Sequence, residues 1–482
     1  MDIDKNQNSS LEKENVEISE QTSEKNTDNN GKRKINEVEN STENDNEASN
    51  GNKKDLKKIK KQTTRKPWAP KERKEGEVVE KRRPKKKCAL LMGFCGTGYQ
   101  GMQINPGAKT IEGDLWKALV EAKAVSKDNA EDPKKISFVR AARTDKGVHA
   151  VGQVISGKFI IEDEDIVEKI NAALPEQIRV WDIIRTSNSF HAKNAADSRI
   201  YEYLLPSYCL MPANPIYYPN SGIAKDLPNK EEIIKKVNNN EPIEIPPYTD
   251  EEIQKFRDYR ISKEKLETFR QALESYVGSH NYHNFTVGKK FEEESSTRYI
   301  ISFKCSDPFI RNGVEWLSLK IQGQAFMIHQ IRKMIGFVVM LLRTGTTISL
   351  ISTAFSKIKM NIPKVPGDGL WLDQVVIQSY SKRFPNNKPI TFEPYKDKIE
   401  PFREKYIYSK IIEEEHNSNC FIEWLKCVDS HSWEIQYFLN AEGVVKLDQR
   451  PDYLIQQEKI ENGIKVDHPV ENTNEKAEDD IF

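Results

Sequence analysis

Two periodicities of apolar positions run through the middle of the chain, residues 88–385, and together they predict a mixture of strands and helices. Apolar residues three and four positions apart, as at Ile111, Leu115 and Leu119, form one face of a helix. This spacing predicts helices at 110–124, 164–173, 266–277 and 328–344. Short apolar runs and strict alternation predict strands at 88–94, 135–144, 152–161, 198–206, 297–305 and 315–326.

The pattern of strands with crossing helices occurs twice, before and after a stretch rich in Pro, Asn, Lys and Glu. Each half is expected to form an antiparallel sheet with helices on one face, so the predicted fold class is α+β. The predicted divisions are a disordered tail with basic clusters (1–87), a first subdomain that carries Asp145 (88–206), a polar surface insertion (207–262), a second subdomain (263–385), a helical extension (386–428) and an acidic tail of unknown role (429–482).

Charge is distributed unevenly although the chain as a whole is neutral, with 74 basic and 74 acidic residues. The net charge is −7 for residues 1–50, +12 for 51–87 and −9 for 386–482, which leaves +4 for the body. A mildly basic body behind a strongly basic segment suits a polyanionic partner. Basic clusters at 32–34, 53–61 and 81–87 are typical of nuclear import signals or of non-specific RNA contacts.

Several classes of protein are excluded by what the sequence lacks. No run approaches the ~18 consecutive apolar residues of a membrane span. The first residues, MDIDKNQNSS, carry no apolar segment, so we expect no secretory signal. Six scattered cysteines without a CxxC pair argue against a disulfide framework or a structural zinc site, and two of them, Cys420 and Cys427, have no histidine partners.

The segment RAARTDKGVHA, 140–150, contains the carboxylate most suited to chemistry. Asp145 follows a predicted strand, lies in a turn that Gly147 permits, and has Arg143 and Lys146 as neighbours. Neighbouring cations favour the ionised form of a carboxylate, which then serves as nucleophile or base. Composition alone favours an ordinary turn Asp that caps the next segment, with Arg and Lys as solvated neighbours.

Five segments in order resemble the TruA-type pseudouridine synthases. R-T-D-x-G-V-H at 143–149 is similar to the catalytic loop of that family. The other similar segments are FCGTGYQGMQINPGAKTIEGDLWKAL (94–119), SFHAKNAADSRIYEYLL (189–205), GQAFMIHQIRKMIG (323–336) and VPGDGLWL (365–372). Residues 386–428 resemble the eukaryotic branch called pseudouridine synthase 1, Lys193 departs from the usual Arg, and 429–482 resemble nothing in the family.

The resemblance implies a fold, a reaction and roles for five residues. The fold is a catalytic body of two RNP-like subdomains around a central basic cleft. The reaction isomerises uridine to pseudouridine without a metal or a cofactor. The implied roles are the catalytic carboxylate for Asp145, stacking on the target base for Tyr201, pairing with the carboxylate for Arg332, replacement of the flipped nucleotide in the RNA for Arg143, and packing beneath the uracil for Leu370.

Alternatives weaken some of these assignments. Tyr203 fits a buried strand position better than a binding role, Leu370 is nearly as consistent with a plain core residue, and His149 is expected to be structural rather than a general base. A nuclease would need clustered carboxylates for metal ions, and the sequence places no second one near Asp145. A non-catalytic RNA-binding protein would have no need for a buried carboxylate that faces RNA phosphates.

The implied partner is RNA, because an enzyme that rotates a base must first remove it from the stack. The resemblance implies tRNA, modified at several positions around the anticodon stem, with small nuclear RNA and messenger RNA as further substrates. The branch that modifies the lower anticodon stem is the nearest rival within the family. The basic clusters favour the nucleus and leave room for a mitochondrial pool, no membrane partner is expected, and a monomer is slightly favoured.

Overall fold

The computed structural model describes residues 83–238, 245–430, 437–440 and 442–443, all within one compact unit, Glu80–Phe482. The predicted N-terminal tail up to residue 82 and the acidic tail from residue 444 lie outside the described residues. The first strand begins at Lys86, and Arg83 already forms ion pairs with Glu162 and Asp163. The described fold thus starts a few residues before the predicted position 88.

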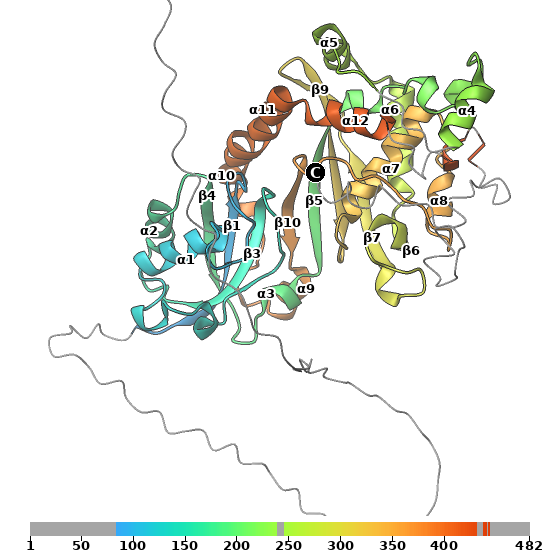
Figure 1. The fold of residues 1–482 in the computed structure, drawn as a ribbon. Coiled ribbons are helices and arrows are strands. Elements are labelled where there is room, and N and C mark those ends of the chain that lie inside the picture. The colour runs from blue at the N-terminus through green and yellow to red at the C-terminus, as the bar shows by residue number, and fades with distance from the viewer. Residues whose placement is uncertain (1–82, 239–244, 431–436, 441, 444–482) are drawn as a thin grey trace, which may run out of the picture. The chain divides into compact units, whose positions relative to one another are not determined.

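A ten-stranded sheet forms the centre of this unit (Figure 1). Its strands are β1 (Lys86–Phe94), β2 (Val139–Arg140), β3 (His149–Phe159), β4 (Ile178–Arg185), β5 (Ser198–Pro206), β6 (Gly278–Asn281), β7 (Thr297–Cys305), β8 (Phe309–Arg311), β9 (Val314–Gly323) and β10 (Leu370–Val376). They follow the order β4-β1-β3-β10-β5-β9-β7-β6, with β2 beside β3 and β8 beside β9. Every pairing is antiparallel except that of β10 with β3.

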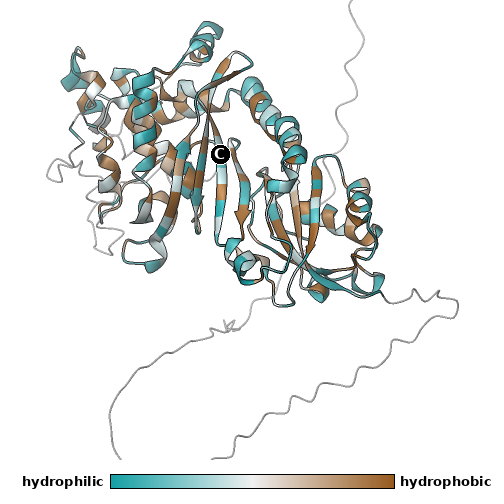
Figure 2. Ribbon diagram, turned by 180° about the vertical axis from the view of Figure 1, so that it is seen from behind, coloured by the Kyte–Doolittle hydropathy of each residue, from teal (hydrophilic) through white to brown (hydrophobic). Residues whose placement is uncertain are grey.

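The helices flank this sheet and extend beyond it. They are α1 (Ile111–Glu121), α2 (Ile166–Ala173), α3 (Ala192–Ala195), α4 (Lys230–Asn238), α5 (Asp250–Asp258), α6 (Lys263–Glu274), α7 (Gln330–Thr344), α8 (Leu350–Ala354), α9 (Gln378–Arg383), α10 (Lys396–Arg403), α11 (Ser409–Ser418) and α12 (Cys420–Ser430). A π-helical turn, Glu404–Tyr408, joins α10 to α11. Figure 2 shows hydrophobic residues gathered along the strands and hydrophilic residues frequent on the helices.

Local signals explain where several helices begin and end. The Thr110 hydroxyl accepts a hydrogen bond from the Gly113 N–H and caps α1, and Thr249 with Glu252 forms a capping box on α5. Gly345 ends α7 in the left-handed conformation, with φ of 64°. These are short-range effects, which is why most predicted helices occur close to their predicted bounds.

The α+β class and the helical extension are confirmed, whereas two details differ from the expectation. The two predicted sheets are halves of one sheet, because β10 pairs with β3 on one side and with β5 on the other. The predicted strand at 135–144 is reduced to Val139–Arg140. Pro133 starts a capped 3-10 turn there, and Ser137 adopts a left-handed conformation that no strand accommodates.

Part of the segment predicted as a polar surface insertion, 207–262, is packed into the interior of the protein. Its first residues, Tyr208, Cys209 and Leu210, are fully buried, and the Tyr208 hydroxyl donates to Glu415 of α11.

Within the described part of the chain, no helix combines the length and the apolar composition needed to cross a bilayer.

Candidate active site

The candidate catalytic carboxylate lies on an exposed loop that leads into β3. Asp145, Arg143 and Lys146 are all exposed to solvent, so the expectation of a buried carboxylate is wrong. The loop is tied at both ends: the Met102 N–H donates to the Thr144 carbonyl at 3.2 Å, and the Val148 N–H donates to the Asp145 carbonyl at 3.3 Å. Gly147 has φ of 77°, a conformation that strongly favours glycine. The turn predicted around Asp145 is therefore present.

A second, glycine-containing loop packs against the back of the first. A Cβ atom on Gly96 would lie 2.3 Å from the Val148 carbonyl oxygen, and one on Gly101 would lie 3.1 Å from the Thr144 carbonyl oxygen. The Gly96 N–H also donates to the His149 Nδ1 atom at 3.0 Å. The opening motif GTGYQG thus supports the carboxylate loop through its backbone, which only small residues permit.

Tyr201 lies on β5 within electrostatic reach of Asp145. Its half-buried ring meets Phe326 edge-on, with the ring centroids 5.4 Å apart. Burial raises the pKa of the Tyr201 phenol to about 12, with the negative charge of Asp145 adding to the shift and Arg199 opposing it. The ring is therefore a neutral phenol at neutral pH.

Arg332 approaches from the first turn of α7. Its Nε donates to the Val365 carbonyl at 2.6 Å, while its buried Nη2 has no hydrogen-bond partner in the described structure. Burial lowers the pKa of Arg332, and the charges of Asp368 and Asp145 act against that shift. Among the described residues no ion pair joins Arg332 to Asp145, so the two charges interact without the predicted direct contact.

Gly367 borders this guanidinium at ordinary van der Waals distance. A Cβ atom on Gly367 would lie 3.5 Å from the Arg332 Nη1 atom, and Gly369 packs against the Leu204 carbonyl oxygen and the Tyr203 ring. Leu370, the next residue, is the half-buried first residue of β10 and is paired in register with Tyr203. The structure thus places Leu370 beside the strand of Tyr201, and Arg143 on the exposed loop of Asp145. Their predicted contacts with RNA stay predictions.

Sequence reasoning missed two residues of this region. Arg199, the first residue of the R-x-Y-x-Y segment, donates from Nη2 to the Ala141 carbonyl at 3.1 Å and from Nη1 to the Gln324 carbonyl at 2.8 Å. It thereby ties the Asp145 segment to the end of β9. An Arg in alternation with two tyrosines was the available signal, but only the structure shows what it binds.

His329 is the second missed residue. It precedes α7 in a left-handed conformation, with φ of 59°, which is uncommon for a residue with a Cβ atom. Burial lowers the pKa of His329 to about 4, assisted by Lys364, Arg332 and Lys333 and opposed by Asp145. Its side chain is therefore a neutral imidazole within electrostatic reach of Asp145.

Two residues have the structural roles that were expected of them. His149 is buried, and burial lowers the pKa of its imidazole to about 4. Tyr203 is buried and donates from its hydroxyl to the Pro366 carbonyl at 2.7 Å. Among the described residues, no three His, Cys, Asp or Glu side chains gather as a metal-binding group.

The charge of Asp145 acts electrostatically on residues of two other segments, Tyr201 of β5 and Arg332 of α7. Asp145 carries an exposed carboxylate, Tyr201 carries a neutral phenol ring, and Arg332 carries an N–H group that has no partner within the described structure. Such a set suits a flat, uncharged ring carried on an anionic polymer. The predicted central basic cleft stays a prediction.

Comparison with known proteins identifies close relatives. A family model described as tRNA pseudouridine synthase matches residues 272–376. The chain is 40% identical over 446 residues to tRNA pseudouridine synthase 1 of Yarrowia lipolytica, and the aligned region covers 83% of this chain and 84% of that protein. It is 46% identical over 363 residues to tRNA pseudouridine synthase 1 of Saccharomyces cerevisiae, covering 66% and 67%. The mouse pseudouridylate synthase 1 homolog is 36% identical over 365 residues, covering 74% and 77%.

Proposed function

The chain belongs to the tRNA pseudouridine synthase family, and from this premise we propose that it isomerises uridine to pseudouridine in tRNA with Asp145 as the catalytic carboxylate. In this reaction the bond between uracil N1 and ribose C1′ breaks, the base turns, and a bond forms between C5 and C1′. A proton leaves C5 and N1 becomes protonated, so no oxidant or reductant takes part. Attack at C1′, attack at C6 and removal of the ribose 2′ proton remain three separate routes for Asp145.

The observation that supports this proposal is that the charge of Asp145 acts on both Tyr201 and Arg332. The three residues come from a loop, a strand and a helix. The Tyr201 phenol, whose pKa is raised to about 12, is neutral at pH 7, which suits a ring that stacks on the extruded uracil better than a base. Stacking of this kind is worth about 1–3 kcal/mol per base. In the proposed complex Arg332 orients the carboxylate, and Arg143 fills the gap left in the RNA.

The test is the isosteric substitution Asp145→Asn. We expect the variant to fold and to bind tRNA like the wild type, and to form no pseudouridine, because the amide is neither a nucleophile nor a base at this position. Release of tritium from C5-labelled uridine in tRNA measures turnover, and filter binding measures affinity. As the control, Asp128→Asn makes the same change at an exposed aspartate of residues 88–206 and should retain full activity.

Turnover by Asp145→Asn at the wild-type rate would remove this carboxylate from the mechanism. Binding of tRNA without any turnover by the wild type would instead favour an RNA-binding protein that performs no chemistry.

The finer proposals concern substrates and location. We propose several uridines around the anticodon stem as targets, with small nuclear RNA and messenger RNA as additional substrates, and residence in the nucleus. The basic clusters at 32–34, 53–61 and 81–87 and the resemblance of 386–428 to the eukaryotic branch support this. Mapping pseudouridines in cells with and without the protein tests the targets: sites restricted to the lower anticodon stem would assign it to the rival branch.

A further inference from the structure

The two halves of the sheet meet at a short joint. β10 pairs with β3 through Trp371↔His149 and Leu372↔Ala150, whereas β5 pairs with β9 from Arg199↔Gly323 through Pro206↔Trp316. Asp145 belongs to the β3 side of this joint, and Tyr201 and Arg332 belong to the other side. Small rotations at the joint would therefore change the spacing between the carboxylate and its two partners.

A segment of the C-terminal extension crosses the joint. We call residues 396–408, which comprise α10 and the π-helical turn, the brace. On the β3 side, the Phe402 ring meets Trp181 of β4 edge-on, with centroids 5.3 Å apart. The Tyr406 hydroxyl donates to Glu176 at 2.6 Å, just before β4. These contacts fix the brace to the half that carries Asp145.

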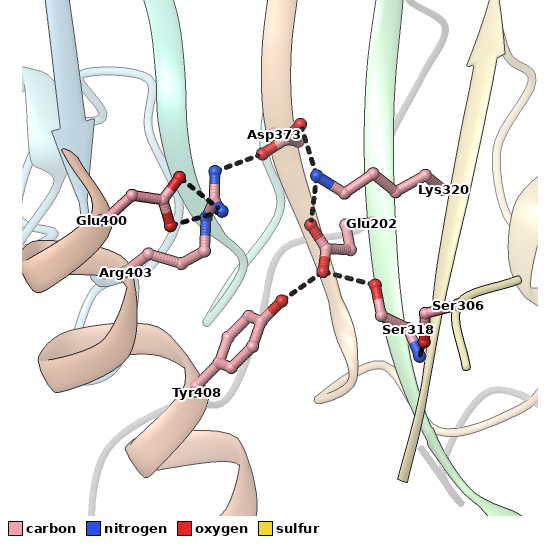
Figure 3. A network of polar contacts seen from close by, with 8 residues as sticks. All are labelled: Glu202, Ser306, Ser318, Lys320, Asp373, Glu400, Arg403 and Tyr408. Atoms are coloured by element: carbon pink, nitrogen blue, oxygen red, sulfur yellow. Dashed lines mark hydrogen bonds and ion pairs between the residues drawn. The ribbon is translucent and has the colours of Figure 1, made fainter. Parts of the chain in front are cut away.

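On the other side, the brace binds three strands. The Arg403 Nη2 atom lies 3.1 Å from an Asp373 carboxylate oxygen on β10. The Tyr408 hydroxyl donates to Glu202 on β5, and Glu404 pairs with Arg311 of β8 at 3.1 Å. Figure 3 shows Arg403 and Tyr408 reaching from the brace to Asp373 and Glu202 on neighbouring strands.

Glu202 is the centre of this network and is fully buried. It also accepts from the Ser318 hydroxyl at 2.6 Å and pairs with Lys320 at 3.1 Å. A buried carboxylate of this kind is stable only while its donors stay in place, because losing one leaves charge without compensation. Glu202 directly follows Tyr201, and successive side chains of a strand point to opposite faces. The network thus holds β5 from the face opposite to Tyr201.

From these contacts we infer that Glu202, Arg403 and Tyr408 are positioning residues, through which the brace fixes the spacing between Asp145 and the pair Tyr201 and Arg332. The inference rests on the proposed isomerase function. A loss of the network should lower kcat while leaving the affinity for tRNA nearly unchanged, because a misplacement near 1 Å costs about 100-fold in rate at the extreme.

The decisive comparison uses two tyrosines, the half-buried Tyr408 and the buried Tyr218, which each donate to a buried carboxylate. Tyr408→Phe removes the hydroxyl that binds Glu202 across the joint, whereas Tyr218→Phe removes a hydroxyl that donates to Asp429 at 2.6 Å, away from the joint. We expect comparable losses in melting temperature, but a fall in kcat of about fivefold or more for Tyr408→Phe alone. Single-turnover tritium release well below both melting temperatures gives the rates.

A second pair of variants separates positioning from stability. Arg403→Gln should lower kcat, and Arg403→Lys, which keeps the charge facing Asp373, should restore part of it at unchanged KM. Equal kcat values for Tyr408→Phe and Tyr218→Phe would overturn the inference, as would changes confined to KM. Absence of turnover in the wild type would instead overturn the proposed function, so the two failures are distinguishable.

Discussion

At the scale of single residues, burial holds His149 and His329 in their neutral form. The pKa of His149 and that of His329 are both lowered to about 4, against an ordinary value of 6.5. The His149 Nδ1 atom accepts the Gly96 N–H, so a proton on that atom would break the contact between the two loops. The imidazole of His149 therefore supports the carboxylate loop structurally.

This arrangement predicts acid sensitivity with a definite sign. In the unfolded chain His149 takes up a proton below about pH 6.5, whereas in the folded protein it stays neutral down to about pH 4. Because the unfolded state binds more protons between these values, the free energy of unfolding decreases as the pH falls from 6.5 to 4. The contribution is up to about 3 kcal/mol. Denaturant unfolding from pH 7 to pH 4 should show a shallower pH dependence for His149→Gln than for the wild type, while the exposed His416→Gln should not differ. Identical slopes for all three proteins would contradict the assignment.

At the scale of elements, the site depends on loops that pack backbone to backbone. The turn at 94–101 lies against the carboxylate loop, and Gly96 leaves no room there for a side chain. Gly107, farther along the same segment, has φ of 79°, and a Cβ atom there would meet no other atom within 4 Å. The two glycines therefore serve different needs, close approach at the first and backbone conformation at the second.

The two glycines give a matched test. Gly96→Ala should displace Val148 and Asp145 and cost about 1–3 kcal/mol of stability through overpacking. Gly107→Ala should cost about 1–2 kcal/mol through the left-handed backbone alone. At permissive temperature we expect Gly96→Ala to lose most of its turnover and Gly107→Ala to retain it, as measured by tritium release. Full activity of Gly96→Ala would show that the carboxylate loop tolerates movement.

At the scale of the whole molecule, net charge changes sign between neighbouring segments of the N-terminal part of the sequence. Residues 51–82 carry 13 basic and 5 acidic side chains, net +8, while residues 1–50 carry a net −7. Since cations that contact phosphates release counterions, their contribution to affinity falls as salt rises. The basic segment adjoins the fold at Arg83, which is itself held by Glu162 and Asp163.

Two truncations separate these charges. Removal of residues 1–50 should leave tRNA affinity equal to or tighter than that of the full chain, because it removes net negative charge. Removal of residues 1–82 should weaken binding relative to the first truncation and flatten the dependence of log K on log salt, because phosphate contacts are lost. Filter binding at several salt concentrations measures both, and kcat at saturating tRNA should stay constant. A large fall in kcat would assign the segment a part in catalysis.

The sequence by itself determined the local features of this protein. Helix and strand periods depend on neighbours a few residues apart, so β5 at Ser198–Pro206 and β7 at Thr297–Cys305 occur where alternation predicts them. The turn at Asp145 follows from Gly147, and the family motifs identified Tyr201 and Arg332.

Only the tertiary structure decided how these parts meet. Three features join residues far apart in the chain: the position of β10 between β3 and β5, the hydrogen bond from Arg199 to the Ala141 carbonyl, and the network around Glu202. Such contacts depend on strand order and on burial shared by many segments. No local pattern encodes either of these, because the free energy of a buried ion pair exists only once the surrounding elements have excluded water.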